Sequence, residues 1–320
     1  MTKSKFSIFL FFLIFILVNE SYSSKYSGLD GNYPVKIINK KTMKVQNRPE
    51  PLSVRISAPK YFSLSPLIIF SHGSRCHVDG SNDLTEYWSS HGYTVVHPLH
   101  LDGYLPSRIK QYSREQISFH RFKDMSLVLD KLEFLFSEEK EILNKIDLSK
   151  IIAAGHSYGA LVAQASGGAK IYSQGEFKKK ISSFDKRFKT IIAISPPGYM
   201  KNFVDSDSAK SINLPMLVTT GTKDIIPPFM PTWDIHTVSF HDAPKGNKFL
   251  AVINNADHWF GGLLCRKTDN EEQNKEMKTL KAITLAFLDF TLYKNSIAEN
   301  FLDQLYKKEI KKGIYDFQIK

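Results

Sequence analysis

The pentapeptide Gly155–Gly159, with the sequence Gly-His-Ser-Tyr-Gly, constrains this chain more than any other feature. The apolar run over residues 150–154 predicts a buried strand before it, and residues 160–165 predict a helix after it. A G-x-S-x-G motif between a strand and a helix is typical of a sharp turn that exposes a nucleophilic serine. The two glycines leave room for a strained backbone at Ser157. Because the motif also arises by chance, an ordinary serine in a glycine-rich turn is the alternative, and the surrounding sequence must decide.

The N-terminus has the features of a secretory signal peptide. Lys3 and Lys5 give the chain a basic start, and an apolar run follows over residues 6–18. Small residues two apart within 21–23 then form a plausible cleavage site. This run is shorter than the ~20 residues that a membrane span needs, although an uncleaved membrane anchor stays open. We therefore expect a signal peptide over 1–23 and a secreted or periplasmic mature chain over 24–320.

The mature chain is long enough for one large domain, and it has no internal repeat or low-complexity linker. The formal net charge of the chain is +11, with lysine and arginine gathered in residues 178–189 and 307–312. Such runs indicate solvated surface, with a weak attraction to anionic surfaces as the alternative. No nucleic-acid motif accompanies them, so we expect no nucleic-acid partner.

Apolar runs that suit buried strands alternate with segments of helical periodicity. This alternation predicts an α/β fold with a mostly parallel central sheet and helices on both faces. In such sheets the active site lies beyond the carboxyl ends of the strands. The expected strands are 52–58, 66–71, 94–97, 151–154, 190–195, 215–219 and 248–253, the last of the chain, and the expected long helices are 82–91, 121–136 and 272–293.

Two residues beyond Ser157 provide the partners that a nucleophilic serine needs. A serine hydroxyl requires a base to take its proton and an acid to orient that base. Asp224 comes soon after the strand 215–219, and His258 comes soon after the strand 248–253. We predict that Ser157 is the nucleophile, His258 the base and Asp224 the orienting acid.

Other residues of the same types fit these roles less well. Asp234 is an alternative to Asp224, and His236 and His241 are alternatives to His258, but neither histidine follows a clear buried strand. His156 is adjacent to the nucleophile, so we expect it to pack or to donate a hydrogen bond.

Acyl transfer also requires donors for the oxyanion. The N–H of Tyr158, after the nucleophile, is one candidate. The second is the N–H of Ser74, because Gly73 in the loop after the strand 66–71 lets the backbone approach a substrate. The alternative is that Gly73 serves only as a turn residue.

These motifs resemble those of α/β-hydrolases of the platelet-activating factor acetylhydrolase and dienelactone-hydrolase-like group, and more distantly those of cutinase-like polyester hydrolases. Dienelactone hydrolases proper have cysteine at the position of Ser157. The resemblance implies an α/β-hydrolase fold, an esterase acting on short or modified acyl esters, and no metal or organic cofactor. The length of the segment 198–213 leaves room for a small cap or none. The matching segments are residues 70–73, Arg121 with Asp124, the pentapeptide, 221–224 and 256–262.

Two features near the predicted site bear on its shape. Cys76 and Cys265 are the two cysteines of the chain, and an even pair in an exported protein predicts one disulfide, with two free thiols as the alternative. Aromatic side chains are candidates for lining a substrate pocket, although core packing is the favoured alternative for each one. The pocket candidates are Tyr87, Trp88, Phe229, Trp233 and Trp259.

The leading functional hypothesis is an exported serine esterase whose substrate is a small-molecule or lipid-like carboxylic ester. An amidase or peptidase with the same three residues is the second hypothesis. The third is a catalytically inactive binding protein with the same fold, against which the presence of all three residues counts.

Overall fold

The computed structural model describes residues 25–104, 111–172, 180–201 and 203–320. The predicted signal peptide lies outside the described residues. Among those residues, no helix is both long and apolar enough to cross a membrane.

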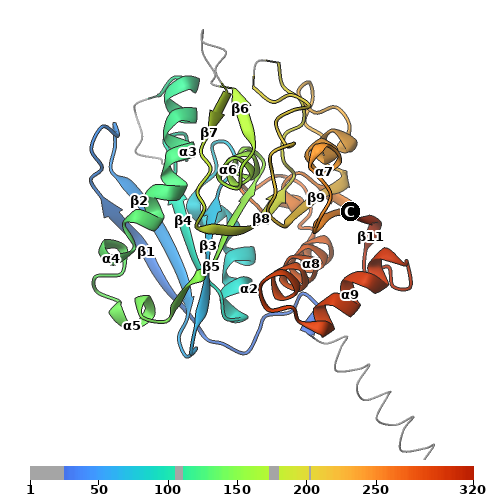
Figure 1. The fold of residues 1–320 in the computed structure, drawn as a ribbon, viewed down its shortest axis with the longest axis horizontal. Coiled ribbons are helices and arrows are strands. Elements are labelled where there is room, and N and C mark those ends of the chain that lie inside the picture. The colour runs from blue at the N-terminus through green and yellow to red at the C-terminus, as the bar shows by residue number, and fades with distance from the viewer. Residues whose placement is uncertain (1–24, 105–110, 173–179, 202) are drawn as a thin grey trace, which may run out of the picture.

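A twisted sheet of nine strands runs through the described part of the chain, in the order β1-β2-β4-β3-β5-β8-β9-β10-β11 (Figure 1). The six strands from β4 to β10 pair in parallel, whereas β1, β2 and β11 are antiparallel to their neighbours. This confirms the mostly parallel sheet that the sequence predicts. The strands are β1 Val35–Met43, β2 Leu52–Pro59, β3 Ser65–Ser71, β4 Thr94–Leu99, β5 Ile146–His156, β8 Phe188–Ile194, β9 Met216–Lys223, β10 Lys248–Asp257 and β11 Ile314–Ile319.

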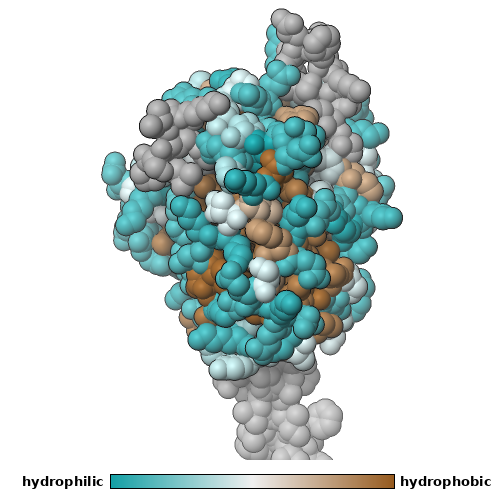
Figure 2. Space-filling model, turned by 90° about the vertical axis from the view of Figure 1, so that its left-hand side faces the viewer, coloured by the Kyte–Doolittle hydropathy of each residue, from teal (hydrophilic) through white to brown (hydrophobic). Residues whose placement is uncertain are grey.

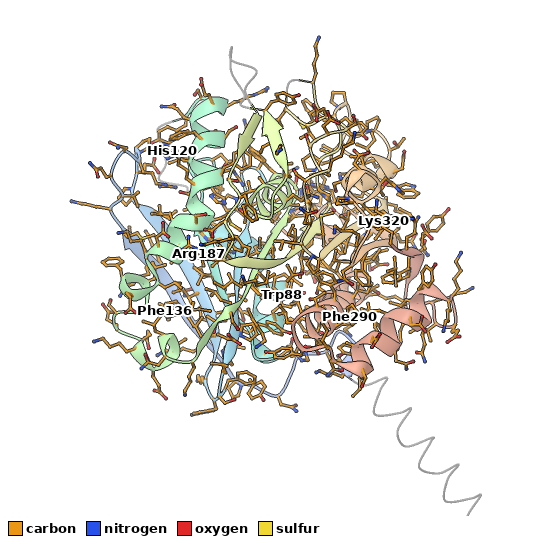
Figure 3. All side chains as sticks on the ribbon, viewed as in Figure 1. Trp88, His120, Phe136, Arg187, Phe290 and Lys320 are labelled. Atoms are coloured by element: carbon orange, nitrogen blue, oxygen red, sulfur yellow. A yellow bond between two sulfur atoms is a disulfide. The ribbon has the colours of Figure 1, made fainter. Side chains whose placement is uncertain are left out.

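Helices cover both faces of the sheet, because its central strands are apolar on both sides. On β3, Leu67 and Ile69 face one core with α3 and α6, and Ile68 and Phe70 face the other with α2, α8 and α9. Trp88 lies in this second core (Figure 3). The long helices are α2 Asn82–Ser90, α3 Arg114–Asp130, α6 Tyr158–Ser166, α8 Asn274–Tyr293 and α9 Ser296–Tyr306.

Short elements complete the fold. The strands β6 and β7 pair into a small antiparallel ladder of their own, apart from the main sheet (Figure 1). Between β8 and β9, the described residues form turns and a bridge from Met200 to Val204, in keeping with the small cap that the sequence predicts. The short elements are η1 Val78–Ser81, α4 Leu132–Leu135, α5 Lys140–Leu143, β6 Lys170–Tyr172, β7 Lys180–Ser182, η2 Trp233–Thr237, α7 Val238–Asp242 and η3 Phe260–Gly262.

Two expectations about the elements are wrong. The strand at 248–253 is not the last, because β11 adds to its outer edge and buries Phe317. The expected helix 121–136 begins earlier, at Arg114, where Ser113 and Gln116 form a capping box, and it breaks at Lys131 into α3 and α4.

The edge strand β1 carries charges that discourage pairing with another sheet. Lys36 pairs with Glu139, and Lys41 pairs with Glu138. The face of the molecule in Figure 2 is covered mostly by hydrophilic side chains, with hydrophobic ones showing between them.

Candidate active site

Ser157 occupies a strained turn between β5 and α6. Its φ of +55° and ψ of −122° lie outside the regions that side-chain-bearing residues prefer, and its N–H donates to the Ile194 carbonyl at 2.8 Å. A Cβ at Gly155 would lie 2.2 Å from the Gly159 carbonyl oxygen, and one at Gly159 would lie 1.9 Å from that of Ser71. Only glycine fits at both positions, which gives the sequence motif its physical reason.

Asp224 and His258 meet at the carboxyl ends of the neighbouring strands β9 and β10. His258 Nδ1 donates to Asp224 Oδ1 at 2.7 Å, and the hydroxyl of Thr220 donates to Oδ2 at 2.8 Å. Both side chains of the pair are almost completely buried. Burial alone would raise the pKa of Asp224, but His258 and His236 outweigh it and hold that pKa well below its usual range. The carboxylate is thus ionised beside the ring that it orients.

His156 ties the Ser157 turn to the His258 loop. Its Nε2 donates to the His258 carbonyl at 2.8 Å, and the two ring centroids are 4.7 Å apart. Burial and the neighbouring His258 hold the pKa of His156 well below its usual value, so the ring is neutral. The residue therefore has the packing and donor role expected beside a nucleophile.

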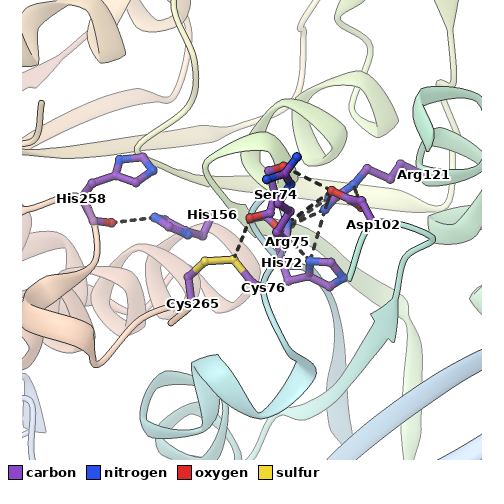
Figure 4. The surroundings of a disulfide bond; sticks show 10 residues. His72, Ser74, Arg75, Cys76, Asp102, Arg121, His156, His258 and Cys265 are labelled. Carbon is purple, nitrogen blue, oxygen red and sulfur yellow. Dashed lines mark hydrogen bonds and ion pairs between the residues drawn. A yellow bond between two sulfur atoms is a disulfide. The ribbon is translucent and has the colours of Figure 1, made fainter. Parts of the chain in front are cut away.

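A buried arginine holds the loop that carries Ser74. The Arg121 guanidinium donates to the carbonyls of His72 and Gly73 at 2.8 and 2.9 Å, and to both oxygens of Asp102 at 2.7 and 3.0 Å (Figure 4). Burial would raise the pKa of Asp102, but Arg121 outweighs burial and holds it far below its usual range. The sequence singled out Arg121 without a role for it and gave no signal for Asp102.

The two predicted oxyanion donors lie on different elements. Tyr158 is the first residue of α6, where backbone N–H groups have no intrahelical acceptor. Ser74 is exposed on the loop after β3, and its hydroxyl lies 3.4 Å from Asp102. The assignment of both N–H groups as oxyanion donors stays a prediction.

Cys76 and Cys265 form a disulfide with a Cα–Cα distance of 5.0 Å. It links the loop of Ser74 to the loop that follows His258 (Figure 4). A Cβ at Gly73 would lie 2.8 Å from the sulfur of Cys76 and 3.2 Å from that of Cys265. The disulfide therefore packs directly against the backbone of the predicted oxyanion loop.

A second polar network contacts the end of β3, where the loop of Ser74 begins. The carboxylate of Asp124 accepts from Arg48 at 3.1 and 3.2 Å and contacts His100 Nδ1 at 2.9 Å. The other ring nitrogen of His100 is 2.8 Å from the Ser71 hydroxyl, at the end of β3. Asp124, named in the sequence motif, thus supports the strand that leads into the site.

Two clusters bring side chains of metal-ligand types together among the described residues. In the cluster of Cys76, His156 and Cys265, the sulfurs are bonded to each other, so no thiolate is present to bind a cation. In the cluster of Asp224, His236 and His258, the carboxylate lies in contact with both imidazole rings.

The five aromatic pocket candidates differ in burial and in position. Tyr87 and Trp88 are fully buried in the core with α8, because the apolar face of α2 turns them inward. They therefore pack in the core, the alternative to lining a substrate pocket. Trp233 is half-buried against Tyr315 of β11.

Two aromatic candidates remain close to the predicted triad in sequence and are accessible. Trp259 is next to His258, with the guanidinium of Arg266 stacked 4.4 Å from its ring centroid. Phe229, on the loop after Asp224, is 68% exposed. These two remain candidates for contact with a substrate.

The alternative acid and bases take other positions. Asp234 is exposed and His241 is exposed on α7. His236, in contrast, is completely buried, and its Nε2 lies 3.0 Å from Asp224 Oδ1. The sequence offered His236 only as a substitute for His258, whereas the structure places both rings on one carboxylate.

The parallel sheet, its flanking helices and the serine turn at the end of β5 define an α/β-hydrolase fold. Comparison with protein families agrees with this class. Residues 25–202, more than half of the chain, match the family described as Chlorophyllase. The chain belongs to the Chlorophyllase family, and this membership indicates an ester hydrolase of the α/β-hydrolase type. The matched segment contains Ser74 and Ser157 and ends before Asp224. No curated protein matches the chain.

Proposed function

We propose that this protein is an exported serine esterase that hydrolyses carboxylic esters through Ser157, His258 and Asp224. The observation that carries the proposal is the buried 2.7 Å contact between Asp224 and His258, on the loop that His156 joins to the Ser157 turn. The family match supports ester hydrolysis in general. The serine mechanism, the export and the substrate class are our proposals.

In this mechanism His258 Nε2 takes the proton of the Ser157 hydroxyl as its oxygen attacks the ester carbonyl. The negative charge that develops on the carbonyl oxygen is stabilised by the N–H groups of Ser74 and Tyr158. The protonated His258 then gives its proton to the departing alcohol, which leaves an acyl group on Ser157. A water molecule, deprotonated by His258, releases the acid and restores the serine.

The proposed substrates are esters with a short or modified acyl group, including lipid-like esters. Among the residues that the structure describes, the segment between β8 and β9 is small and forms no large lid. Trp259 and Phe229 offer apolar surface near the ends of β10 and β9. Chlorophyll, which the family's name points to, is a further substrate to test.

The decisive test compares Ser157→Ala with Ser137→Ala on p-nitrophenyl esters of increasing acyl length. Ser137 is an exposed serine after α4, so its replacement leaves the candidate site intact. We expect Ser157→Ala to lose at least about 10³-fold in kcat and Ser137→Ala to match the parent. Equal activity of Ser157→Ala and the parent contradicts the proposal. Faster cleavage of a matched anilide than of the ester makes the protein an amidase instead.

Export is tested separately from catalysis. Expression of the full chain with its N-terminus, followed by N-terminal sequencing of the secreted or periplasmic product, is expected to show a chain that begins near Ser24. Retention of residues 1–23 in a membrane fraction contradicts a cleaved signal peptide.

A further inference from the structure

His236 is a second histidine on the carboxylate that orients His258. It lies in η2, which packs on β9, and no part of its side chain is exposed. Its Nε2 is 3.0 Å from Asp224 Oδ1, the same oxygen that accepts from His258 Nδ1. Its other ring nitrogen, Nδ1, is 2.8 Å from the carbonyl oxygen of Pro196.

Both ring nitrogens of His236 therefore face oxygens that only accept hydrogen bonds. A carbonyl oxygen requires a proton on Nδ1. A neutral ring would then carry a lone pair on Nε2, which would lie against the ionised Asp224. A proton on Nε2 replaces this repulsion by attraction, even though the N–H is not aimed closely enough at the oxygen to form an aligned hydrogen bond. The two contacts together favour the doubly protonated, cationic ring.

The surroundings of His236 contain little to oppose such a cation. The neighbouring ring of His258 has its centroid 5.6 Å away, and His156, at the end of β5, is neutral. On α7, His241 is exposed and Asp242 accepts from the Tyr199 hydroxyl at 2.7 Å. Asp234, on η2 itself, is exposed. Burial alone would lower the pKa of His236, but Asp224 and the carbonyl of Pro196 outweigh it and raise that pKa.

We propose that His236 is a cationic positioning residue that shares Asp224 with His258 and opposes the build-up of positive charge on His258. The proposal rests on the triad of the proposed function. During the reaction His258 becomes an imidazolium ion, and a fixed positive charge beside the same carboxylate disfavours that state. The base therefore stays unprotonated, and the enzyme stays active, at lower pH than a triad with a single histidine would allow.

Two substitutions separate charge from hydrogen bonding. In His236→Gln the side-chain amide nitrogen takes the place of Nε2, so the donor to Asp224 is kept while the charge is lost. In His236→Asn it takes the place of Nδ1, so the donor to Pro196 is kept. We expect both variants to move the acidic limb of the kcat/KM profile upward by about one pH unit. His241→Gln, an exposed histidine on α7, is the matched control and is expected to keep the parent profile.

A profile for His236→Gln that coincides with the parent shows that His236 acts only as a hydrogen-bond donor, and it overturns the proposal. A downward shift overturns it as well. A nitrogen-15 NMR titration of histidine-labelled Ser157→Ala protein tests the charge without any turnover. Both ring nitrogens of His236 are expected to stay protonated at pH 7, and a deprotonated Nε2 at that pH contradicts the proposal. Because this measurement needs no activity, failure of the esterase assignment and failure of the His236 assignment give different results.

Discussion

The two halves of the candidate site are held in different ways. In the histidine half, which consists of Asp224 and His258, a charged carboxylate contacts the side chain that we propose as the base. In the oxyanion half, the charged side chain of Arg121 contacts backbone carbonyls of residues 72 and 73 and is neutralised by Asp102. The disulfide from Cys76 to Cys265 joins the two halves.

The difference follows from what each half must do in the proposed reaction. A histidine that gains and loses a proton needs a negatively charged partner, which stabilises its protonated form. Oxyanion donors are backbone N–H groups that act only when they are fixed at the right position. The side chains around them must therefore hold the main chain of the loop in place. The charge of Asp224 thus stabilises a proposed reaction state, whereas the charge of Arg121 fixes the position of a loop.

The largest expected effect lies in the histidine half. Asp224→Asn is expected to lower kcat by about 10³- to 10⁴-fold, because the neutral amide no longer orients and stabilises the protonated His258. Steady-state kinetics on a short ester measures this. Asp257→Asn is the matched control, since that carboxylate accepts from the N–H groups of Trp259 and Gly261 and an amide oxygen can still do so. Similar losses in both variants would contradict the assignment of Asp224.

The oxyanion half is expected to show a smaller loss. Arg121→Lys keeps the charge, but an ammonium group has too few donors to replace the contacts to His72, Gly73 and Asp102. We expect kcat to fall by about 10- to 100-fold, because the Ser74 loop is no longer fixed. Arg187→Lys, at a partly exposed pair with Asp185, is the control. An unchanged kcat in Arg121→Lys shows that the loop does not depend on Arg121.

Removing the link between the halves tests their coupling. The double variant Cys76→Ser, Cys265→Ser is expected to lose about 2–5 kcal/mol of unfolding free energy, because the bond closes a loop with a sequence separation of 189 residues. Denaturant unfolding of the variant and of the oxidised parent measures this. We also expect a few-fold loss of kcat, since the sulfurs pack against Gly73. A variant as stable as the parent would show that the halves are held independently.

The ion pair of Asp185 and Arg187, outside the candidate site, shows how small an effect a charge pair has when it supports neither half. Burial would raise the pKa of Asp185, but hydrogen bonds from Arg187 outweigh it and hold the pKa at about 2. The stability from this pair is present above the unfolded pKa of about 3.9 and is lost as the pH falls through about 2. Because Arg187 is partly exposed and also pairs with Asp130, we expect Asp185→Asn to cost at most about 1 kcal/mol at pH 7 and almost nothing near pH 1.5. Urea unfolding at both pH values checks this, and an equal loss at both would exclude the charge pair as its cause.

Much of the fold was predictable from the sequence. The strands β3, β4, β5, β8, β9 and β10 are apolar runs buried on both faces, so local composition marks them. The edge strands β1 and β11 were not predicted, because most of their residues are only partly buried and pairing with a distant part of the chain decides their conformation.

The candidate site divides in the same way. Ser157, Asp224 and His258 stand out because each follows a predicted strand. Asp102 and His236 do not, because their importance comes from Arg121 and Asp224, which fold against them from other elements. The burial of Tyr87 and Trp88 likewise depends on how α2 packs against α8.

By itself the sequence determined what is local in this protein. It determined the glycine-flanked turn at Ser157, the alternation of strands and helices, and the order in which the serine, the acid and the histidine follow those strands. Only the tertiary structure decided which charges meet: two histidines on Asp224 and one arginine on Asp102. The physical reason is that electrostatic interactions depend on distance and burial, which residues far apart in the chain acquire only when it folds.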